Sequence, residues 1–98
     1  MKQVVVQFNF PKVSLQQYDG VWNDLRATGN AHPKGLISHV GAPTSDGGLL
    51  VIDVWESEEL FNEFGKTLMP VIIKQDIQLV PPKILQAHYL QIEHAEMA

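Results

Sequence analysis

The order in which strand-like and helix-like segments follow one another constrains the fold of this chain most. Residues 3–10 are rich in β-branched and aromatic side chains, which predicts a strand. Ser14 and Gln17 have the spacing of a capping box, so a helix is expected to begin after Ser14. Apolar residues then recur at steps of three and four, and Gly29 is expected to end that helix. The first part of the chain therefore predicts a strand followed by a helix.

The middle of the chain has the pattern of a β-hairpin. Residues 35–42 and 49–55 are both strand-like, and the turn-forming pair Asp46 and Gly47 lies between them. Two strands with so short a connection run antiparallel. We therefore expect the second and third strands of the fold to pair directly.

A second helix and a last strand complete the pattern. Ser57 is a suitable N-cap, and acidic residues follow it where the positive end of a helix dipole favours them. Pro70 is expected to interrupt this helix, so that residues 71–73 form a second short helical piece. Residues 84–92 are expected to form the last strand.

The resulting β-α-β-β-α-β order is that of the ferredoxin-like plan, an α+β fold with a four-stranded antiparallel sheet. Right-handed crossovers place both helices on one face of that sheet. We expect residues 1–98 to form a single domain with this architecture, because their number suits one domain.

The sheet face without helices is expected to be apolar. The strand over residues 49–55 carries apolar side chains on both faces, with Leu50, Ile52 and Val54 on one and Leu49, Val51 and Trp55 on the other. A bare apolar sheet face is unstable in water and marks an interface. We therefore expect a homodimer that packs sheet against sheet.

Charge and composition exclude several classes of protein. The chain has 7 Lys and Arg against 11 Asp and Glu, a net charge of -4, so a nucleic-acid partner is not expected. It has no Cys, which excludes disulfides, thiolate catalysis and Cys-based metal sites. The sequence has no signal-peptide pattern and no apolar run long enough to cross a bilayer. We expect a cytoplasmic protein without a membrane partner.

Polar residues inside the predicted strands are the candidates for a site. Strand alternation suggests that Asn9, His39, Asp53 and His88 gather into one polar cluster on a buried surface of the sheet. Buried polar groups without partners are costly, so these side chains are expected to bond to one another.

Three interpretations of this cluster stay open. In the first, His39 or His88 is a catalytic base, and Asp53 orients it for proton transfer. In the second, the cluster is a structural network in which His39 and Asp53 pair across the hairpin. In the third, two histidines and a carboxylate bind a divalent metal, but the sequence has no H-x-H or H-E-x-x-H motif, and we expect no metal.

Aromatic residues close to this cluster predict a ligand pocket. Trp55, Trp22 and Tyr18, together with Asn9, are candidates for lining the pocket and for stacking on a planar ligand. Trp22 and Tyr18 also lie on the apolar stripe of the first helix, so packing in the core is the alternative role for both.

Three stretches of the chain resemble a known family. Residues 51–64, with Trp55-Glu56-Ser57 at their centre, resemble a strand-to-helix junction of the antibiotic-biosynthesis-monooxygenase-like group. Residues 35–41 resemble the second strand of that group, and residues 68–71 resemble the leucine, proline, valine continuation of many small members. The resemblance covers nearly the whole chain. It implies a ferredoxin-like subunit of a dimeric α/β barrel.

The resemblance implies a choice of activities, because this superfamily includes cofactor-free monooxygenases, haem-degrading oxygenases, isomerases and proteins without known activity. Haem-degrading members resemble one another in an Asn on the first strand, a Trp, and a His on the second helix. Asn9 and Trp55 match the first two, but the helix after Ser57 has no histidine, and we expect no haem or other cofactor. The expected function is that of a cofactor-independent monooxygenase or isomerase for a small aromatic or enolisable molecule. The alternative is a non-catalytic module that binds a small ligand or a partner.

Overall fold

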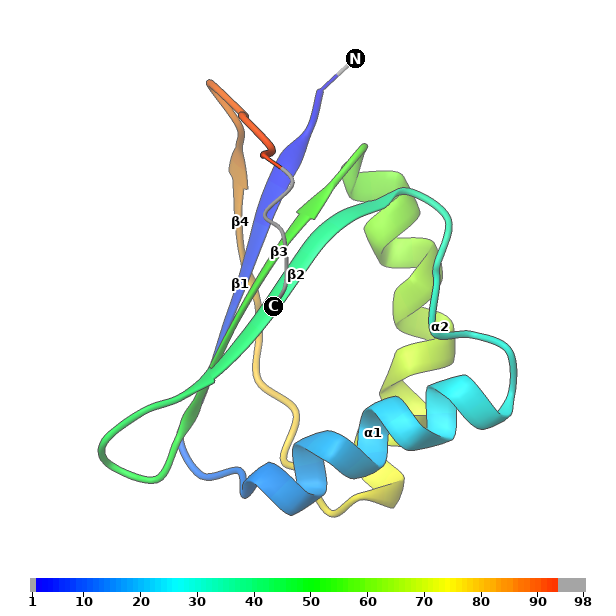
Figure 1. The fold of residues 1–98 in the computed structure, drawn as a ribbon, viewed down its shortest axis with the longest axis vertical. Helices are drawn as coiled ribbons and strands as arrows, with labels where there is room; N and C mark the ends of the chain where they lie inside the picture. The colour runs from blue at the N-terminus through cyan, green and yellow to red at the C-terminus, as the bar shows by residue number, and fades with distance from the viewer. Residues whose placement is uncertain (1, 94–98) are drawn as a thin grey trace.

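Residues 2–93, which the computed structural model describes, form a four-stranded antiparallel sheet with two helices on one of its faces (Figure 1). The elements in chain order are β1 (Val4–Phe10), α1 (Leu15–Ala27), β2 (Leu36–Pro43), β3 (Leu49–Trp55), α2 (Glu58–Lys74) and β4 (Lys83–Gln86). The strands lie in the order β2-β3-β1-β4, and each neighbouring pair is antiparallel. The predicted ferredoxin-like fold is confirmed.

Strand register separates the two faces of the sheet. Val6 pairs with Asp53 and Val4 with Trp55, so these side chains share the face that carries the helices. The side chains of Val6 and Trp55 are fully buried there, as is that of Leu25 from α1. Apolar burial of this kind is the main stabilising contribution to the fold. The core therefore lies between the sheet and the two helices.

The opposite face of the sheet has no helix against it among residues 2–93, and Figure 1 shows both helices on the same side. Leu50, Ile52 and Val54 of β3 are half-buried on this open face. Val40 of β2 is 54% exposed, and Leu85 of β4 is 49% exposed. The open face therefore presents apolar side chains from three strands.

The predicted start of α1 is confirmed in detail. The Ser14 side chain accepts a hydrogen bond from the Gln17 backbone N–H across 3.0 Å, and the Gln17 side chain accepts one from the Ser14 backbone N–H across 2.9 Å. Gly29 follows the Thr28 C-cap with a φ of +76°, a conformation that favours glycine. The cap residues therefore fix where α1 begins and ends.

The expected break at Pro70 is wrong, because α2 continues through it to Lys74. A proline inside a helix removes one backbone hydrogen bond and costs about 3 kcal/mol. Leu68 on one side of Pro70 and Val71 and Ile72 on the other all pack against the same core cluster. Their burial outweighs the local cost, and the exposed proline ring lies on the outer side of the helix.

The last strand is shorter than the predicted span of residues 84–92. The β1–β4 ladder begins where Gln7 pairs with Lys83 and ends where Val4 pairs with Gln86. A further hydrogen bond joins the Ala87 N–H to the Gln3 carbonyl across 2.9 Å. Because β1 itself begins at Val4, the ladder cannot extend along the rest of the predicted segment.

Candidate functional site

The candidate site is built on a direct pair between β2 and β3. His39 and Asp53 are opposite one another in the register of the two strands, and both side chains point to the helix face. Nδ1 of His39 lies 2.5 Å from Oδ1 of Asp53. The Asp53 residue is only 7% exposed, so this carboxylate is a buried charge that requires partners. The predicted contact between His39 and Asp53 is present.

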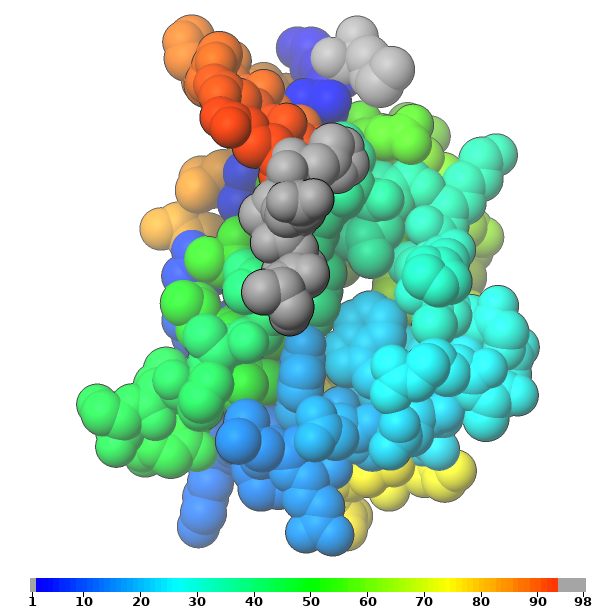
Figure 2. Space-filling model, viewed as in Figure 1, coloured from blue at the N-terminus to red at the C-terminus, as the bar shows by residue number. Residues whose placement is uncertain are grey.

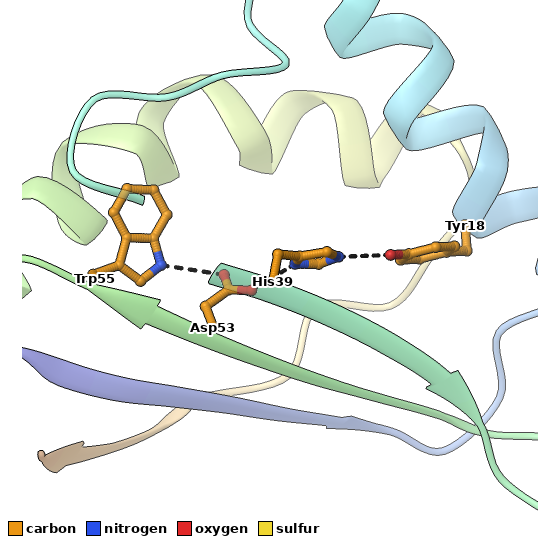
Figure 3. Close-up of polar contacts among 4 residues, drawn as sticks. All are labelled: Tyr18, His39, Asp53 and Trp55. Carbon is orange, nitrogen blue, oxygen red and sulfur yellow. Dashed lines mark hydrogen bonds and ion pairs between the residues drawn. The ribbon is translucent and has the colours of Figure 1, made fainter. Parts of the chain in front are cut away.

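Two aromatic residues extend this pair into a row. Nε1 of Trp55 donates a hydrogen bond to Oδ2 of Asp53 across 3.2 Å, and the Tyr18 hydroxyl lies 2.6 Å from Nε2 of His39. Figure 3 shows Trp55, Asp53, His39 and Tyr18 side by side in that order. We call these four residues the polar row. Tyr18 comes from α1, so the row joins the sheet to a helix.

The donors in the polar row follow from the charge on Asp53. An ionised carboxylate only accepts, so Asp53 takes one hydrogen bond from Trp55 and one from Nδ1–H of His39. In a neutral imidazole the other nitrogen, Nε2, is then the acceptor, and the Tyr18 hydroxyl donates to it. Both nitrogens of His39 are thus engaged, and the outer end of the row is the phenol oxygen of Tyr18.

Burial raises the pKa of the Tyr18 hydroxyl above its ordinary value of 10.0. A contact with Trp22 acts in the opposite direction, and the negative charges of Asp53 and Asp19 raise the pKa further. The phenol is therefore protonated at neutral pH. It serves as a hydrogen-bond donor to His39 in this state.

Gly41 gives the Tyr18 ring the space it occupies. Gly41 is on β2, two residues after His39, and a Cβ atom there would lie 2.6 Å from both Cζ and the hydroxyl oxygen of Tyr18. The role of Tyr18 as the partner of His39 was not predicted from the sequence. A glycine inside a strand pattern marks a close approach, so Gly41 was the available signal.

An apolar cavity of about 60 Å³ lies between the sheet and the helices, beside the polar row. Tyr18, Trp22, His39, Asp53 and Trp55 contribute to its wall, together with aliphatic and aromatic core side chains. The Trp22 and His39 rings meet edge to face with their centroids 4.8 Å apart. The predicted aromatic residues Tyr18, Trp22 and Trp55 therefore do line one cavity.

A wider depression of about 440 Å³ lies on the outer side of the same residues. We call it the outer groove, and Figure 2 shows the surface hollowed where α1 faces β2. Its lining comprises Tyr18, Asp19, Trp22, Arg26, Ala31, His32 and His39. Tyr18, Trp22 and His39 line both the cavity and the outer groove, so they form the partition between the two.

Two residues of the predicted cluster lie elsewhere. Asn9 is exposed on the open face, because Phe8 and Phe10 take the positions on the helix side of β1. His88 is exposed beyond the end of β4, outside the ladder that would have placed it on a sheet face. The prediction that Asn9 and His88 join His39 and Asp53 is therefore wrong. Within residues 2–93, no three or more His, Cys, Asp or Glu side chains lie close enough together to hold a metal ion.

Comparison with known proteins gives structural relatives without sequence relatives. No protein-family model matches the chain, and no curated protein matches it.

No helix in the described part of the chain is long and apolar enough to span a membrane.

Several solved structures share the fold. SnoaB, a cofactor-independent oxygenase from Streptomyces nogalater, is 14% identical with a TM-score of 0.64, over 94% of this chain and 98% of SnoaB. A Caulobacter crescentus protein provisionally described as an antibiotic biosynthesis monooxygenase is 15% identical with a TM-score of 0.64, over 92% of each chain. A dimeric ferredoxin-like protein from an uncultured marine organism is 15% identical with a TM-score of 0.66, over 96% of this chain and 95% of that one. The chain therefore has the ferredoxin-like fold of antibiotic-biosynthesis-monooxygenase-like proteins, and at these identities the likeness extends to the fold alone.

Proposed function

We propose that the protein binds a small aromatic or enolisable molecule at Tyr18 and transfers a proton to and from it. The observation that carries this proposal is the polar row, in which Asp53 holds His39 and His39 holds the Tyr18 hydroxyl. An acid–base group that is oriented by a buried carboxylate and borders a cavity is a typical arrangement for proton transfer. Because both nitrogens of His39 are engaged, the group that meets the ligand is the Tyr18 oxygen.

The proton moves in two linked steps. The ligand gives its acidic proton to the Tyr18 oxygen, while the original Tyr18 proton passes to Nε2 of His39 across 2.6 Å. His39 becomes an imidazolium that the Asp53 carboxylate stabilises. Tyr18 stays neutral throughout, which agrees with the raised pKa of its hydroxyl. His39 is therefore the base, and Tyr18 conducts the proton to it.

Two reaction classes start from the anion that this step leaves on the ligand. In an isomerase the proton returns from His39 through Tyr18 to a different atom of the ligand. In a cofactor-independent monooxygenase the anion attacks dioxygen, a C–O bond forms, and the stored proton goes to the distal oxygen. For a ligand SH2 with two hydrogens on the reacting carbon, this gives the hydroperoxide SH–OOH. Loss of water, which takes the second hydrogen of that carbon, then breaks the O–O bond, so that SH2 and O2 give the oxidised ligand S=O and H2O. The fold shared with SnoaB, a cofactor-independent oxygenase, supports the second class by analogy only.

Deuterium exchange tests the proton transfer without requiring the natural ligand. Phenylacetone is a neutral, aromatic and enolisable probe, and the exchange of its benzylic protons in D2O is followed by NMR. We expect the protein to accelerate this exchange, and His39→Gln and Tyr18→Phe each to reduce the acceleration by roughly 100-fold or more. His88→Gln is the matched control, because His88 is exposed outside the site and its replacement should change nothing. Exchange that persists unchanged in His39→Gln would contradict the proposal.

The second candidate is a non-catalytic ligand-binding module. It is favoured by the completeness of the hydrogen bonding, since no buried side-chain nitrogen or oxygen within the described residues lacks a partner. In that case the polar row is structural. His39→Gln would then lower the free energy of unfolding, while the wild-type protein would bind aromatic ligands without accelerating any exchange.

We further infer that two copies of the chain pack through the open face. Val40 and Leu85 expose apolar surface there, and the half-buried side chains of β3 lie between them. A sheet with helices on one side only is stabilised when its other side is covered. The structural relative from the marine organism, a dimeric ferredoxin-like protein, supports the same assembly for this chain.

A further inference from the structure

We infer that the outer groove binds a planar aromatic carboxylate, with the carboxylate at Arg26 and the acidic group of the ring at Tyr18. The position of the acidic group rests on the proposed proton transfer, whereas the carboxylate site rests on the groove alone. The ligand class follows from the order of side chains along α1.

The spacing of residues along α1 places three different functional groups on one face of the helix. Tyr18, Trp22 and Arg26 follow one another at intervals of four residues, so they lie on one face of α1 about 6 Å apart per step. All three line the outer groove. A ligand that lies along this face meets a hydroxyl, then an indole ring, then a guanidinium group.

The Arg26 end of the groove suits an anion. Nη2 of Arg26 donates to Oδ1 of Asn23 across 2.6 Å, which restrains the guanidinium group while other donors stay available. Among residues 2–93, Arg26 takes part in no ion pair. A guanidinium group binds a carboxylate through two parallel hydrogen bonds. His32, whose ring N–H can donate a hydrogen bond, also lines this groove.

The Tyr18 end of the groove disfavours an anion. Asp19 is exposed beside Tyr18 and lines the same groove, and Asp53 lies behind His39. These carboxylates repel a ligand carboxylate from that end. The charges therefore orient the ligand with its carboxylate toward Arg26 and its other end toward Tyr18.

The middle of the groove suits an aromatic ring. Trp22 is half-buried and its ring already meets His39 edge to face, which fixes the indole in place. A fixed indole offers an offset or edge contact to a second ring.

A pair of probes that differ only in charge tests the inference. We would measure the binding of para-hydroxybenzoate and para-hydroxybenzamide by calorimetry at low ionic strength. We expect the carboxylate to bind the wild-type protein roughly 10- to 100-fold more tightly than the amide. Arg26→Gln should abolish this preference and leave amide binding unchanged, and Arg26→Lys should restore part of it. Lys12→Gln removes an exposed positive charge outside the groove and should keep the full preference.

The outcomes separate this inference from the proposed proton transfer. Equal binding of the two probes, binding of neither, or a preference that survives in Arg26→Gln would overturn the inference. None of these results affects the exchange of phenylacetone, which has no carboxylate. Conversely, an Arg26-dependent preference together with unchanged exchange in His39→Gln would retain the carboxylate site and contradict the proton transfer.

Discussion

Trp55 donates to Oδ2 of Asp53 across 3.2 Å, and this single bond decides which oxygen of the carboxylate is left for His39. The two residues are two positions apart on β3, and both are buried on the helix face. Oδ1 therefore meets Nδ1 of His39, and each oxygen of the Asp53 carboxylate has one partner within the polar row.

We expect Asp53→Asn to reverse the tautomer of His39. The indole N–H of Trp55 needs an acceptor, so the amide oxygen of the new side chain should stay toward Trp55 and the amide NH2 should face His39. Nδ1 would then accept, and Nε2–H would donate to Tyr18. NMR of the imidazole nitrogens distinguishes the two tautomers. If the proton stays on Nδ1 in this variant, the assignment of donors along the polar row is wrong.

Gly41→Ala should displace Tyr18 without changing any residue of the polar row. The new Cβ atom would lie 2.6 Å from the Tyr18 hydroxyl, so the ring must move and its bond to His39 must break. We expect a destabilisation of about 1–3 kcal/mol and the same loss of exchange as in Tyr18→Phe.

Gly65→Ala is the matched control for that substitution. Gly65 lies inside α2, and a Cβ atom there meets nothing within 4 Å. Alanine has the higher helix propensity, so this variant should be more stable by about 0.5–1 kcal/mol. Urea unfolding measures both variants, and a Gly41→Ala protein with wild-type exchange would contradict the role of the Tyr18–His39 bond.

The stability of the protein should fall at alkaline pH through Tyr18. The pKa of Tyr18 is raised in the folded state, whereas the unfolded chain has the ordinary value of 10.0. The stabilising contribution is therefore complete below pH 10.0 and is lost as the pH rises through the higher folded-state pKa. Urea unfolding at a series of pH values should show that the wild type loses stability relative to Tyr18→Phe as the pH rises above 10.0. Tyr89→Phe, at a residue that is 77% exposed, should follow the wild type throughout.

Val40→Lys should separate the proposed dimer into single chains. Val40 is 54% exposed on the open face, and a lysine there would place two like charges in an interface between sheets. Ile73→Lys is the matched control, because Ile73 is 59% exposed on α2, away from that face. Light scattering after size exclusion should give twice the mass of the chain for the wild type and for Ile73→Lys. A single-chain mass for the wild type would contradict the dimer.

Local signals in the sequence were sufficient for most of the fold. Ser14 with Gln17 and Ser57 alone marked the helix starts, because a cap depends on residues close in the chain. Pro70 was misjudged, because local helix chemistry does not include the core contacts of Ile72. The span of the last strand was misjudged for a related reason, since the length of its ladder depends on where β1 begins.

The polar contacts of the site were predicted only where they depend on one hairpin. His39 and Asp53 face each other through the register of β2 and β3, which alternation can indicate. Asn9 was misplaced in the buried cluster, although the apolar residues that alternate with it in β1, among them Phe8 and Phe10, indicate that it lies on the opposite face. The bond from Tyr18 to His39 spans 21 residues and depends on how α1 crosses the sheet, which no periodicity specifies.

The short ladder of β4 has a consequence for local unfolding. Only four residue pairs attach β4 to β1, whereas seven pairs attach β3 to β1. Opening free energies in a native protein are lowest where the fewest such contacts must break. Amide hydrogens of Ile84 and Leu85 should therefore exchange with solvent well before those of Val51 and Ile52, so this margin of the sheet should detach while the hairpin beneath the polar row stays closed.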